Sequence, residues 1–326
     1  MLRRRRGFER RCAKISRLLA WTAILLLIGG QRRVAAQSTQ ADRAQLFQNQ
    51  TGPILPVVPP GSATESQAGA SPNDTDLGEQ EILKRIESYK SFTISVLSSV
   101  FYTSNVELTN SRVVSDLVEA PGGGLYYQPP IAKFLSGLFD VRAQLFYYDR
   151  YHSSDFGSLD AEAGLSYLIP QWHNLFLRAE YDFNLLTSLD HGINETFENH
   201  SIIVDAEIPF HINRAQVISL GADPNISVAA DRESQRRNNY EVYALYSMAV
   251  TRSLSLDASG RVIVRQYYAN NRTDVSEAFA LNATVRLSYW CTISAISSFA
   301  RNDSNHQVFD YSVGNLGGAI SLSFKF

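Results

Sequence analysis

The sequence predicts an all-β protein, a transmembrane antiparallel up-and-down β-barrel of about 12 strands preceded by a disordered N-terminal tether. About twelve runs of alternating apolar and polar residues follow one another between residues 91 and 326, and this period of two is typical of strands with one apolar face. The polar positions repeatedly carry Asp, Glu and Arg, which a water-filled barrel interior accommodates. The links between the runs alternate between short and long, as in a membrane barrel whose N- and C-termini lie on the same side of the membrane.

The first segment, residues 1–36, has the pattern of a secretory signal peptide. A basic stretch precedes the apolar run LLAWTAILLLIGG, and the small residues VAA at 34–36 follow as a cleavage pattern. A spanning helix needs about 20 apolar residues, so an uncleaved anchor is the weaker alternative. Cys12 precedes the apolar run, so its position is not that of a lipoprotein cysteine. Removal of residues 1–36 leaves Cys291 as the single cysteine of the exported chain.

The charge balance changes after this segment. The whole chain has 30 Lys and Arg against 32 Asp and Glu, but residues 1–36 hold ten of the basic residues and only one acid. The remainder has a net charge of −11. A chain this acidic is not expected to bind nucleic acid.

Residues 37–90 are predicted to form a flexible periplasmic tether. Gln, Ser, Thr, Ala, Pro and Gly dominate residues 37–80, and GPILPVVPPG adds a proline cluster. EILKRIESYK at 81–90 has the spacing of a short helix, although it is too short to be stable alone.

Residues 91–326 are predicted to form the barrel. Clear examples of alternation are LDAEAGLSYLI, NLFLRAEYDFNL and ALNATVRLSYW, whereas the runs near 91–105, 215–230 and 291–300 alternate poorly. A soluble sandwich also has alternating strands. We favour the barrel because charged residues recur on the polar face, and because aromatic residues gather at both ends of the runs, as in the two interfacial belts of a membrane barrel. The first belt is Tyr167, Trp172, Phe210, Tyr289, Trp290 and Phe326, and the second is Tyr147, Tyr148, Phe183, Tyr240, Tyr267 and Tyr268.

The last strand, SLSFKF, places Leu322, Phe324 and Phe326 on one face. This ending resembles the C-terminal strand of Gram-negative outer-membrane β-barrel proteins, which ends in Phe. The resemblance implies an outer-membrane location with both termini periplasmic, and contact of these three residues with the barrel assembly machinery and membrane lipid. Residues 101–130 are similar to the opening of β-barrel porins, through Ser104, Asn105, Ser115, Asp116 and the glycines at 122–124, which implies a porin-like barrel.

No catalytic motif, cofactor motif or metal-ligand spacing is present in the sequence, so we expect neither an enzyme nor a cofactor. Two alternatives remain open. His191 and His200 share an acidic segment that is suited to adventitious metal binding. His152 beside Ser153 and Ser154 is the weak candidate for a barrel-embedded hydrolase, which would require a close Ser–His pair.

The residues predicted to line the lumen are the inward charged set. The acids fall mostly in the first half of the barrel and the bases mostly in the second, which predicts opposite walls and a transverse field. The function expected is passive diffusion of small hydrophilic solutes through a narrow charged lumen, and the alternative is an electrically silent scaffold barrel sealed by ion pairs. The set is Asp140, Arg142, Asp160, Glu162, Arg178, Glu180, Asp182, Asp205, Glu207, Glu241, Asp257, Arg261, Arg265, Arg286 and Lys325.

Overall fold

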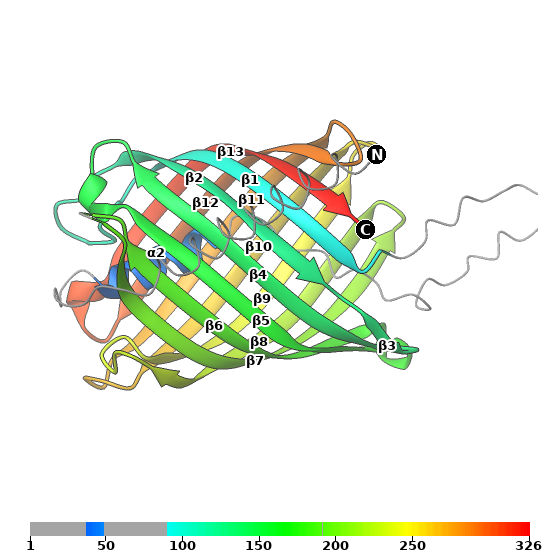
Figure 1. Cartoon of the computed structure of the whole chain (residues 1–326), viewed down its shortest axis with the longest axis horizontal. Coiled ribbons are helices and arrows are strands. Elements are labelled where there is room, and N and C mark those ends of the chain that lie inside the picture. The colour runs from blue at the N-terminus through cyan, green and yellow to red at the C-terminus, as the bar shows by residue number, and fades with distance from the viewer. Residues whose placement is uncertain (1–36, 49–89, 191) are drawn as a thin grey trace, which may run out of the picture.

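The computed structural model describes residues 37–48, 90–190 and 192–326, which form a closed antiparallel barrel with a helix inside it (Figure 1). The helix is α2 (Gln37–Gln48). Twelve long strands and the three-residue β3 (Pro130–Ala132) make the wall. The long strands are β1 (Phe92–Thr103), β2 (Asp116–Tyr127), β4 (Leu135–Tyr148), β5 (Phe156–Ile169), β6 (Leu175–Ser188), β7 (Asn194–Asn213), β8 (Gln216–Ala230), β9 (Arg237–Ala249), β10 (Leu254–Tyr267), β11 (Thr273–Arg286), β12 (Cys291–Ser304) and β13 (Tyr311–Lys325).

Each strand pairs with its neighbours in the chain, and the first and last strands close the ring. β13 pairs with β1 from Thr93↔Lys325 to Thr103↔Asn315, while β2 pairs with β4 beside β3. Phe92 and Phe326 complete this seam, since the amide of Phe326 donates to the Phe92 carbonyl at 2.8 Å. The predicted fold, an up-and-down barrel of twelve strands, is confirmed. Within the described residues, no helix has the length and hydropathy needed to cross a membrane.

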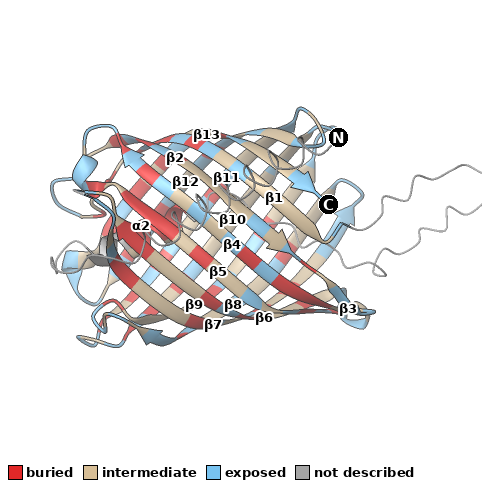
Figure 2. Cartoon of the chain, in the orientation of Figure 1, coloured by how far each residue is buried: buried red, intermediate tan, exposed pale blue. Residues whose placement is uncertain are grey.

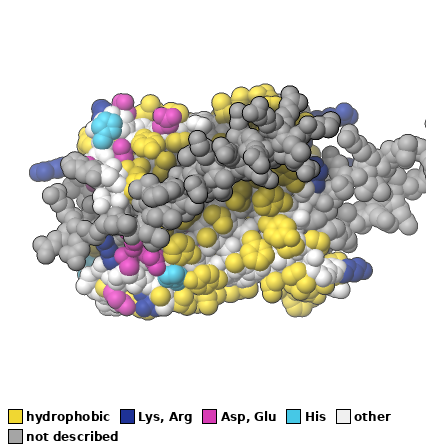
Figure 3. Space-filling model, viewed as in Figure 1, with side chains coloured by type: hydrophobic (Ala, Val, Ile, Leu, Met, Phe, Trp, Pro, Cys, Tyr) yellow, Lys and Arg dark blue, Asp and Glu magenta, His cyan; other side chains and the backbone are white. Residues whose placement is uncertain are grey.

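The outer face of the wall is apolar. Large hydrophobic side chains on the outward positions are 40–65% exposed on many strands, among them Val141, Leu165, Val204, Phe279 and Leu316. Figure 3 shows them covering the visible flank, with charged side chains towards the two ends. A soluble monomer rarely exposes so much contiguous apolar surface, and lipid is the solvent that suits it.

The two ends of the barrel differ in their links. We call one end the loop end; its links are residues 104–115, 149–155, 189–193, 231–236, 268–272 and 305–310. The other is the turn end, where β1 begins and β13 ends. Several loops are shorter than the sequence predicts, because β7 and β9 extend as strands into the polar segments that begin at Asn194 and Arg237.

The predicted tether needs a correction at its start. Gln37–Gln48 do not form a tether but a helix inside the loop end of the barrel, where buried positions are concentrated (Figure 2). The predicted signal segment 1–36 and residues 49–89, with all of the predicted short helix except Lys90, lie outside the described residues.

Most residues of the predicted aromatic belts lie on the outer face of the barrel, but two lie inside it. Tyr147 and Tyr268 are 40% and 47% exposed on the outer face, but their neighbours Tyr148 and Tyr267 are buried inside the barrel. Adjacent strand residues point to opposite faces, so neither pair of tyrosines can lie wholly in one belt.

Candidate functional site in the barrel lumen

The predicted charged set lies at inward positions of the barrel wall. The inward positions follow the two-residue period of each strand, which places buried acids such as Asp140, Glu180 and Asp205 opposite the exposed apolar face. Arg286 and Lys325 also hold inward positions, but they are exposed at the turn end. The acids lie on seven adjacent strands, β4 to β10, and together form what we call the acidic wall: Asp140, Asp160, Glu162, Glu180, Asp182, Asp205, Glu207, Asp223, Glu241 and Asp257.

Three arginines lie within the acidic wall and pair with it. Arg142 bonds Glu162 and approaches Asp140, with Nε–Oδ2 at 3.1 Å. The other two arginines make single close ion pairs: Arg178 with Asp205 at 2.8 Å, and Arg261 with Glu241 at 2.7 Å. The expectation that bases occupy the wall opposite the acids is therefore wrong for these arginines, because each reaches a carboxylate on its own or the adjacent strand.

Tyr243 adds a second anchor within the acidic wall. Its hydroxyl donates to Asp205 Oδ1 at 2.7 Å and to Glu207 Oε2 at 3.3 Å. The ring lies over Gly221, which is its partner in the β8–β9 register, and a Cβ on Gly221 would approach the Tyr243 ring to 2.2 Å. Glycine at 221 is thus required for the position of Tyr243.

Four of the other acids, Glu180, Asp182, Asp223 and Asp257, form no ion pair with a described arginine. Asp182 accepts from Ser201 Oγ at 2.9 Å, and Asp257 accepts from Ser247 Oγ at 2.6 Å. Among the described atoms, one carboxylate oxygen each of Glu180 and Asp223 is buried without a hydrogen-bond partner.

Like charges also face one another across neighbouring strands. Three register pairs place two acids directly opposite each other: Asp140↔Glu162, Glu162↔Asp182 and Asp223↔Glu241. Such pairs destabilise a sheet by a few tenths of a kcal/mol or more. All three of these destabilising acid–acid pairs lie on the acidic wall.

The wall across the lumen, formed by β11, β12, β13, β1 and β2, carries uncharged side chains at mid-height, and most of them are small. The inward positions there include Ser276, Ala278, Ala280, Asn282, Ser294, Ile296, Ser298, Asn315, Gly317, Ala319, Ser95, Ser99, Ala120, Gly122 and Gly124. The lumen is therefore asymmetric, with a carboxylate-rich wall facing a neutral one.

The helix α2 fills the loop end through polar contacts on one part of its surface. Asp42 Oδ1 accepts from Arg237 Nη1 at 2.5 Å and lies 3.9 Å from Arg265 Nε. Gln45 Oε1 accepts from both arginines, at 3.2 and 3.1 Å. Arg43 pairs with Glu107 of the 104–115 loop at 3.4 Å.

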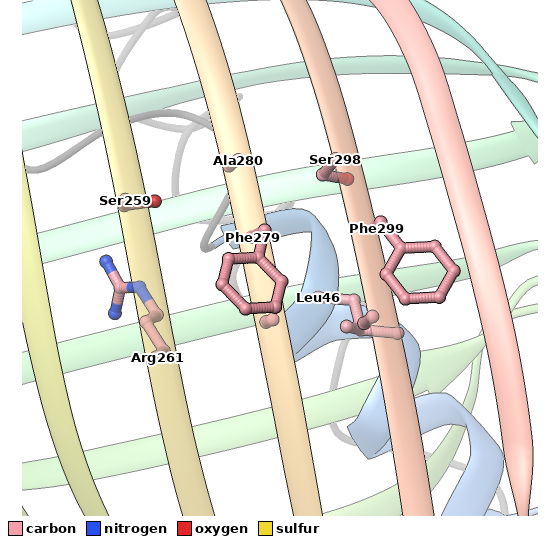
Figure 4. A pocket seen from close by; sticks show the side chains of 9 residues that line it. Leu46, Ser259, Arg261, Phe279, Ala280, Ser298 and Phe299 are labelled. Atoms are coloured by element: carbon pink, nitrogen blue, oxygen red, sulfur yellow. The ribbon is translucent and has the colours of Figure 1, made fainter.

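Apolar contacts hold the rest of α2. The Phe47 ring lies 4.6 Å from Phe101 and 5.1 Å from Phe146, measured between centroids, and Phe146 stacks on Phe156. Leu46 packs on the inner face of the strands that carry Ala280 and Ser298 (Figure 4). A 12-residue helix is marginal in water, so these contacts with the wall stabilise α2.

The ionisation of Asp42 follows from its neighbours. Burial by itself raises the pKa of Asp42, but the charges of Arg237, Arg265 and Arg272 outweigh it, and the pKa lies below its ordinary value of 3.8. Asp42 is therefore a carboxylate at neutral pH.

Sequence reasoning missed several of these residues. The alternation pattern does not indicate Asp223, because Gly221 and Pro224 interrupt the alternation of β8. It does not indicate Arg237 either, because the segment around Arg237 has the composition of a polar loop. Arg237 does lie an even number of residues from Glu241 and Tyr243 along β9. This spacing is the signal that predicts an inward side chain at 237. The signal for α2 is that helix-forming Gln, Ala, Arg and Leu occupy eight of its twelve positions, without Gly or Pro.

The histidines give no hydrolase geometry in the described part of the chain. His200 bonds the Tyr181 hydroxyl and Glu198, and His152 lies 3.7 Å from Asp155. Among the described histidines, none has a ring nitrogen bonded to a serine hydroxyl, and the described residues contain no group of three or more suitable side chains for a metal ion. His191 lies outside the described residues.

The fold and the apolar outer face define a transmembrane β-barrel. No protein-family model matches the sequence, and no curated protein matches it. Among solved structures, the chain is similar to a COG4313 outer membrane channel from Pseudomonas putida F1, with a TM-score of 0.52 and 12% identity over 73% of this chain and 98% of that one. A KdgM porin in complex with disordered oligogalacturonate matches with a TM-score of 0.38 and 8% identity over 71% and 99% of the two chains. A NanC porin matches with 0.41 and 9% over 70% and 98%. The predicted resemblance to outer-membrane β-barrel proteins is confirmed at the level of the fold.

Proposed function

We propose that this protein is an outer-membrane channel for small hydrophilic solutes, with a preference for cations, and that α2 closes the loop end of its lumen at rest. In this model the turn end is periplasmic, and the acidic wall lines the path of the solute. Diffusion is passive, because the negative wall stabilises cations in a confined space without any chemical step.

The observation that carries this proposal is the set of unbalanced acids on β4 to β10. A barrel sealed by ion pairs gains most from alternating charges, whereas here acids face acids in three register pairs and oppose a neutral wall. A row of acids is costly unless water or cations screen it, and a hydrated lumen provides both. The fold shared with an outer membrane channel is consistent with this function.

One observation favours the alternative, an electrically silent scaffold barrel. Every described side chain from Asp42 to Phe47 contacts the wall or is buried within it, so α2 is a well-packed plug. The two candidates differ in whether the lumen conducts once α2 is loosened.

The test is single-channel recording in planar bilayers with a salt gradient. We compare the wild-type protein with the full-length double variant Asp42→Asn/Phe47→Ala, and check that both barrels are folded by heat-modifiable migration on gels. We expect rare openings in the wild type, frequent openings in the double variant, and a reversal potential displaced towards that of the cation. Folded protein that stays silent in both forms would favour the scaffold.

The assembly role of the last strand is a further part of the proposal. Phe324 and Phe326 are 42% and 65% exposed on the outer face at the seam, where they are accessible to both lipid and assembly machinery. The terminal strand must also cover the edge of β1 to close the ring.

A further inference from the structure

We propose that Arg237 and Arg265 form a carboxylate-binding site at the loop end of the lumen, that Asp42 of α2 is its resident occupant, and that a free solute carrying a carboxylate competes for the site and releases the helix. The inference rests on the proposed channel function for its physiological role, whereas the binding site itself is tested independently of conduction.

The charge of the site favours a carboxylate ligand. Arg237 and Arg265 lie on adjacent strands, and their side chains are only 10% and 1% exposed. Among the described residues, neither arginine forms an ion pair with a carboxylate of the barrel wall. Buried guanidinium groups are costly unless an anion neutralises them, and Asp42 is the described anion that does so.

The hydrogen-bond donors around Asp42 also favour a carboxylate ligand. Arg265 Nε is buried without a hydrogen-bond partner and lies 3.9 Å from Asp42 Oδ1. The other Arg265 donors are committed to Asn302 at 3.0 Å and to Gln45 at 3.1 Å. Arg237 Nη1 is also bonded to the Tyr267 hydroxyl at 2.8 Å. Asn302 and Tyr267 belong to the wall, so they continue to position both guanidinium groups after α2 has left.

The neighbouring arginine, Arg272, differs from Arg237 and Arg265 in its partners. Its guanidinium bonds Asp274 and lies over the Tyr267 and Phe309 rings, so the wall already neutralises it. Asp274 is also the register partner of Arg265, but its described ion pair is with Arg272, so the described wall provides an ion pair for Arg272 and for neither Arg237 nor Arg265. Departure of Asp42 increases the net positive charge there and favours an anion.

Competition follows from mass action. A ligand that binds the wall only when Asp42 is absent shifts the equilibrium towards the undocked helix. The tethered Asp42 has a high effective concentration, so a weak free ligand competes visibly only when the other contacts of α2 are weakened. Phe47→Ala provides this background, because it removes the aromatic contact and leaves Arg237, Arg265 and Asp42 intact.

The test uses acetate, which is the chemical equivalent of an Asp side chain. Full-length Phe47→Ala protein is folded in detergent, and hydrogen–deuterium exchange of the 37–48 amides is followed as sodium chloride is replaced by sodium acetate at constant concentration. We expect the exchange rate to rise by about tenfold, which corresponds to ~1.4 kcal/mol of lost docking energy. Phe47→Ala/Arg237→Gln should show no dependence on acetate, and Asp42→Asn should exchange rapidly in both salts.

A matched control is Phe47→Ala/Arg301→Gln, because Arg301 is an exposed arginine paired with Asp303 and its loss should leave the acetate response unchanged. Equal exchange in chloride and acetate in the Phe47→Ala protein would overturn the proposed site. That result would not contradict the channel proposal, because the channel is tested by the conductance of the Asp42→Asn/Phe47→Ala variant. Conversely, an acetate response in a barrel that never conducts supports the site and rejects the channel.

Discussion

Gly317 of β13 lies directly opposite Phe101 of β1, and the Cβ of Phe101 and the backbone beside it occupy the space that a side chain at 317 would need. A Cβ at Gly317 would lie 2.3 Å from both Phe101 Cβ and the Val100 carbonyl oxygen. Phe101 in turn holds the Phe47 ring of α2. The missing side chain at 317 thus positions a residue of the seam and, through it, the plug.

Gly317→Ala is expected to destabilise the barrel by about 1–3 kcal/mol, the usual cost of overpacking, and to loosen α2. The measurement is urea unfolding of the protein in detergent, together with amide exchange of residues 37–48. Gly314→Ala on the same strand is the control, because its Cβ would make only an ordinary contact of 3.8 Å. Equal stability of the two variants would contradict the role assigned to Gly317.

Neutralising the unpaired acids should reduce the cation preference. Asp182→Asn and Asp223→Asn remove acids that form no ion pair with a described arginine, so we expect the cation-to-anion permeability ratio to fall by about twofold or more for the pair. The reversal potential in a salt gradient gives this ratio. Asp303→Asn, which alters an exposed ion pair, is the control and should leave the permeability ratio unchanged. An unaltered ratio in the Asp182→Asn/Asp223→Asn variant would mean that these two acids do not line the path of the ions.

Acid should release α2 through Asp42. Because its docked pKa is below the ordinary 3.8, docking by this carboxylate is fully favourable above pH 3.8 and is lost as the pH falls towards the docked pKa. The charged and titratable groups around it are Arg237, Arg265, Arg272, Asp274, Tyr267 and Tyr311. The arginines stay charged and the tyrosines stay protonated in this range.

The docking equilibrium should change by up to about tenfold per pH unit in that window for a single proton. The open fraction of single channels below pH 4 measures it. Other lumen carboxylates also titrate, so the comparison is with Asp42→Asn, in which this component should be missing. An identical acid response in both proteins would assign the effect to other groups.

Phe326→Asp should strongly reduce insertion into the outer membrane. A charge close to the membrane interface costs only about 0–1 kcal/mol through lipid contact alone, so a large loss of folded barrel would point to recognition of the terminal residue. The readout is the heat-modifiable band in outer-membrane fractions. Lys325→Gln changes the neighbouring rim residue and serves as control, and normal assembly of Phe326→Asp would argue against the proposed signal.

The sequence predicts the strands of the barrel wall well, but it predicts the ion pairs and the helix inside the lumen poorly. Alternation identifies Asp160, Glu162 and Asp182 as inward residues, because a strand allows only two faces. The same rule fails at Asp223, where Gly221 and Pro224 break the pattern. It also cannot tell that Arg178 pairs with Asp205, since this depends on the register between β6 and β7.

The helix α2 illustrates a different difficulty. Its polar composition is typical of a tether, and its stability comes from residues far away in the chain, such as Arg237 and Phe146. Contacts of this kind are decided by tertiary packing and leave little trace in local sequence.

The closure of the ring by β1 and β13 has a consequence for the order of assembly. Of the described elements, α2 is synthesised first and becomes the innermost, whereas β13 is synthesised last and shuts the wall. Ring closure joins segments more than 200 residues apart, and such non-local pairing is slow. Whether α2 enters the lumen before β13 pairs with β1 should therefore determine whether the helix lies inside the barrel when the ring closes. We expect a chain that closes early to form an empty barrel, into which the helix must then be threaded.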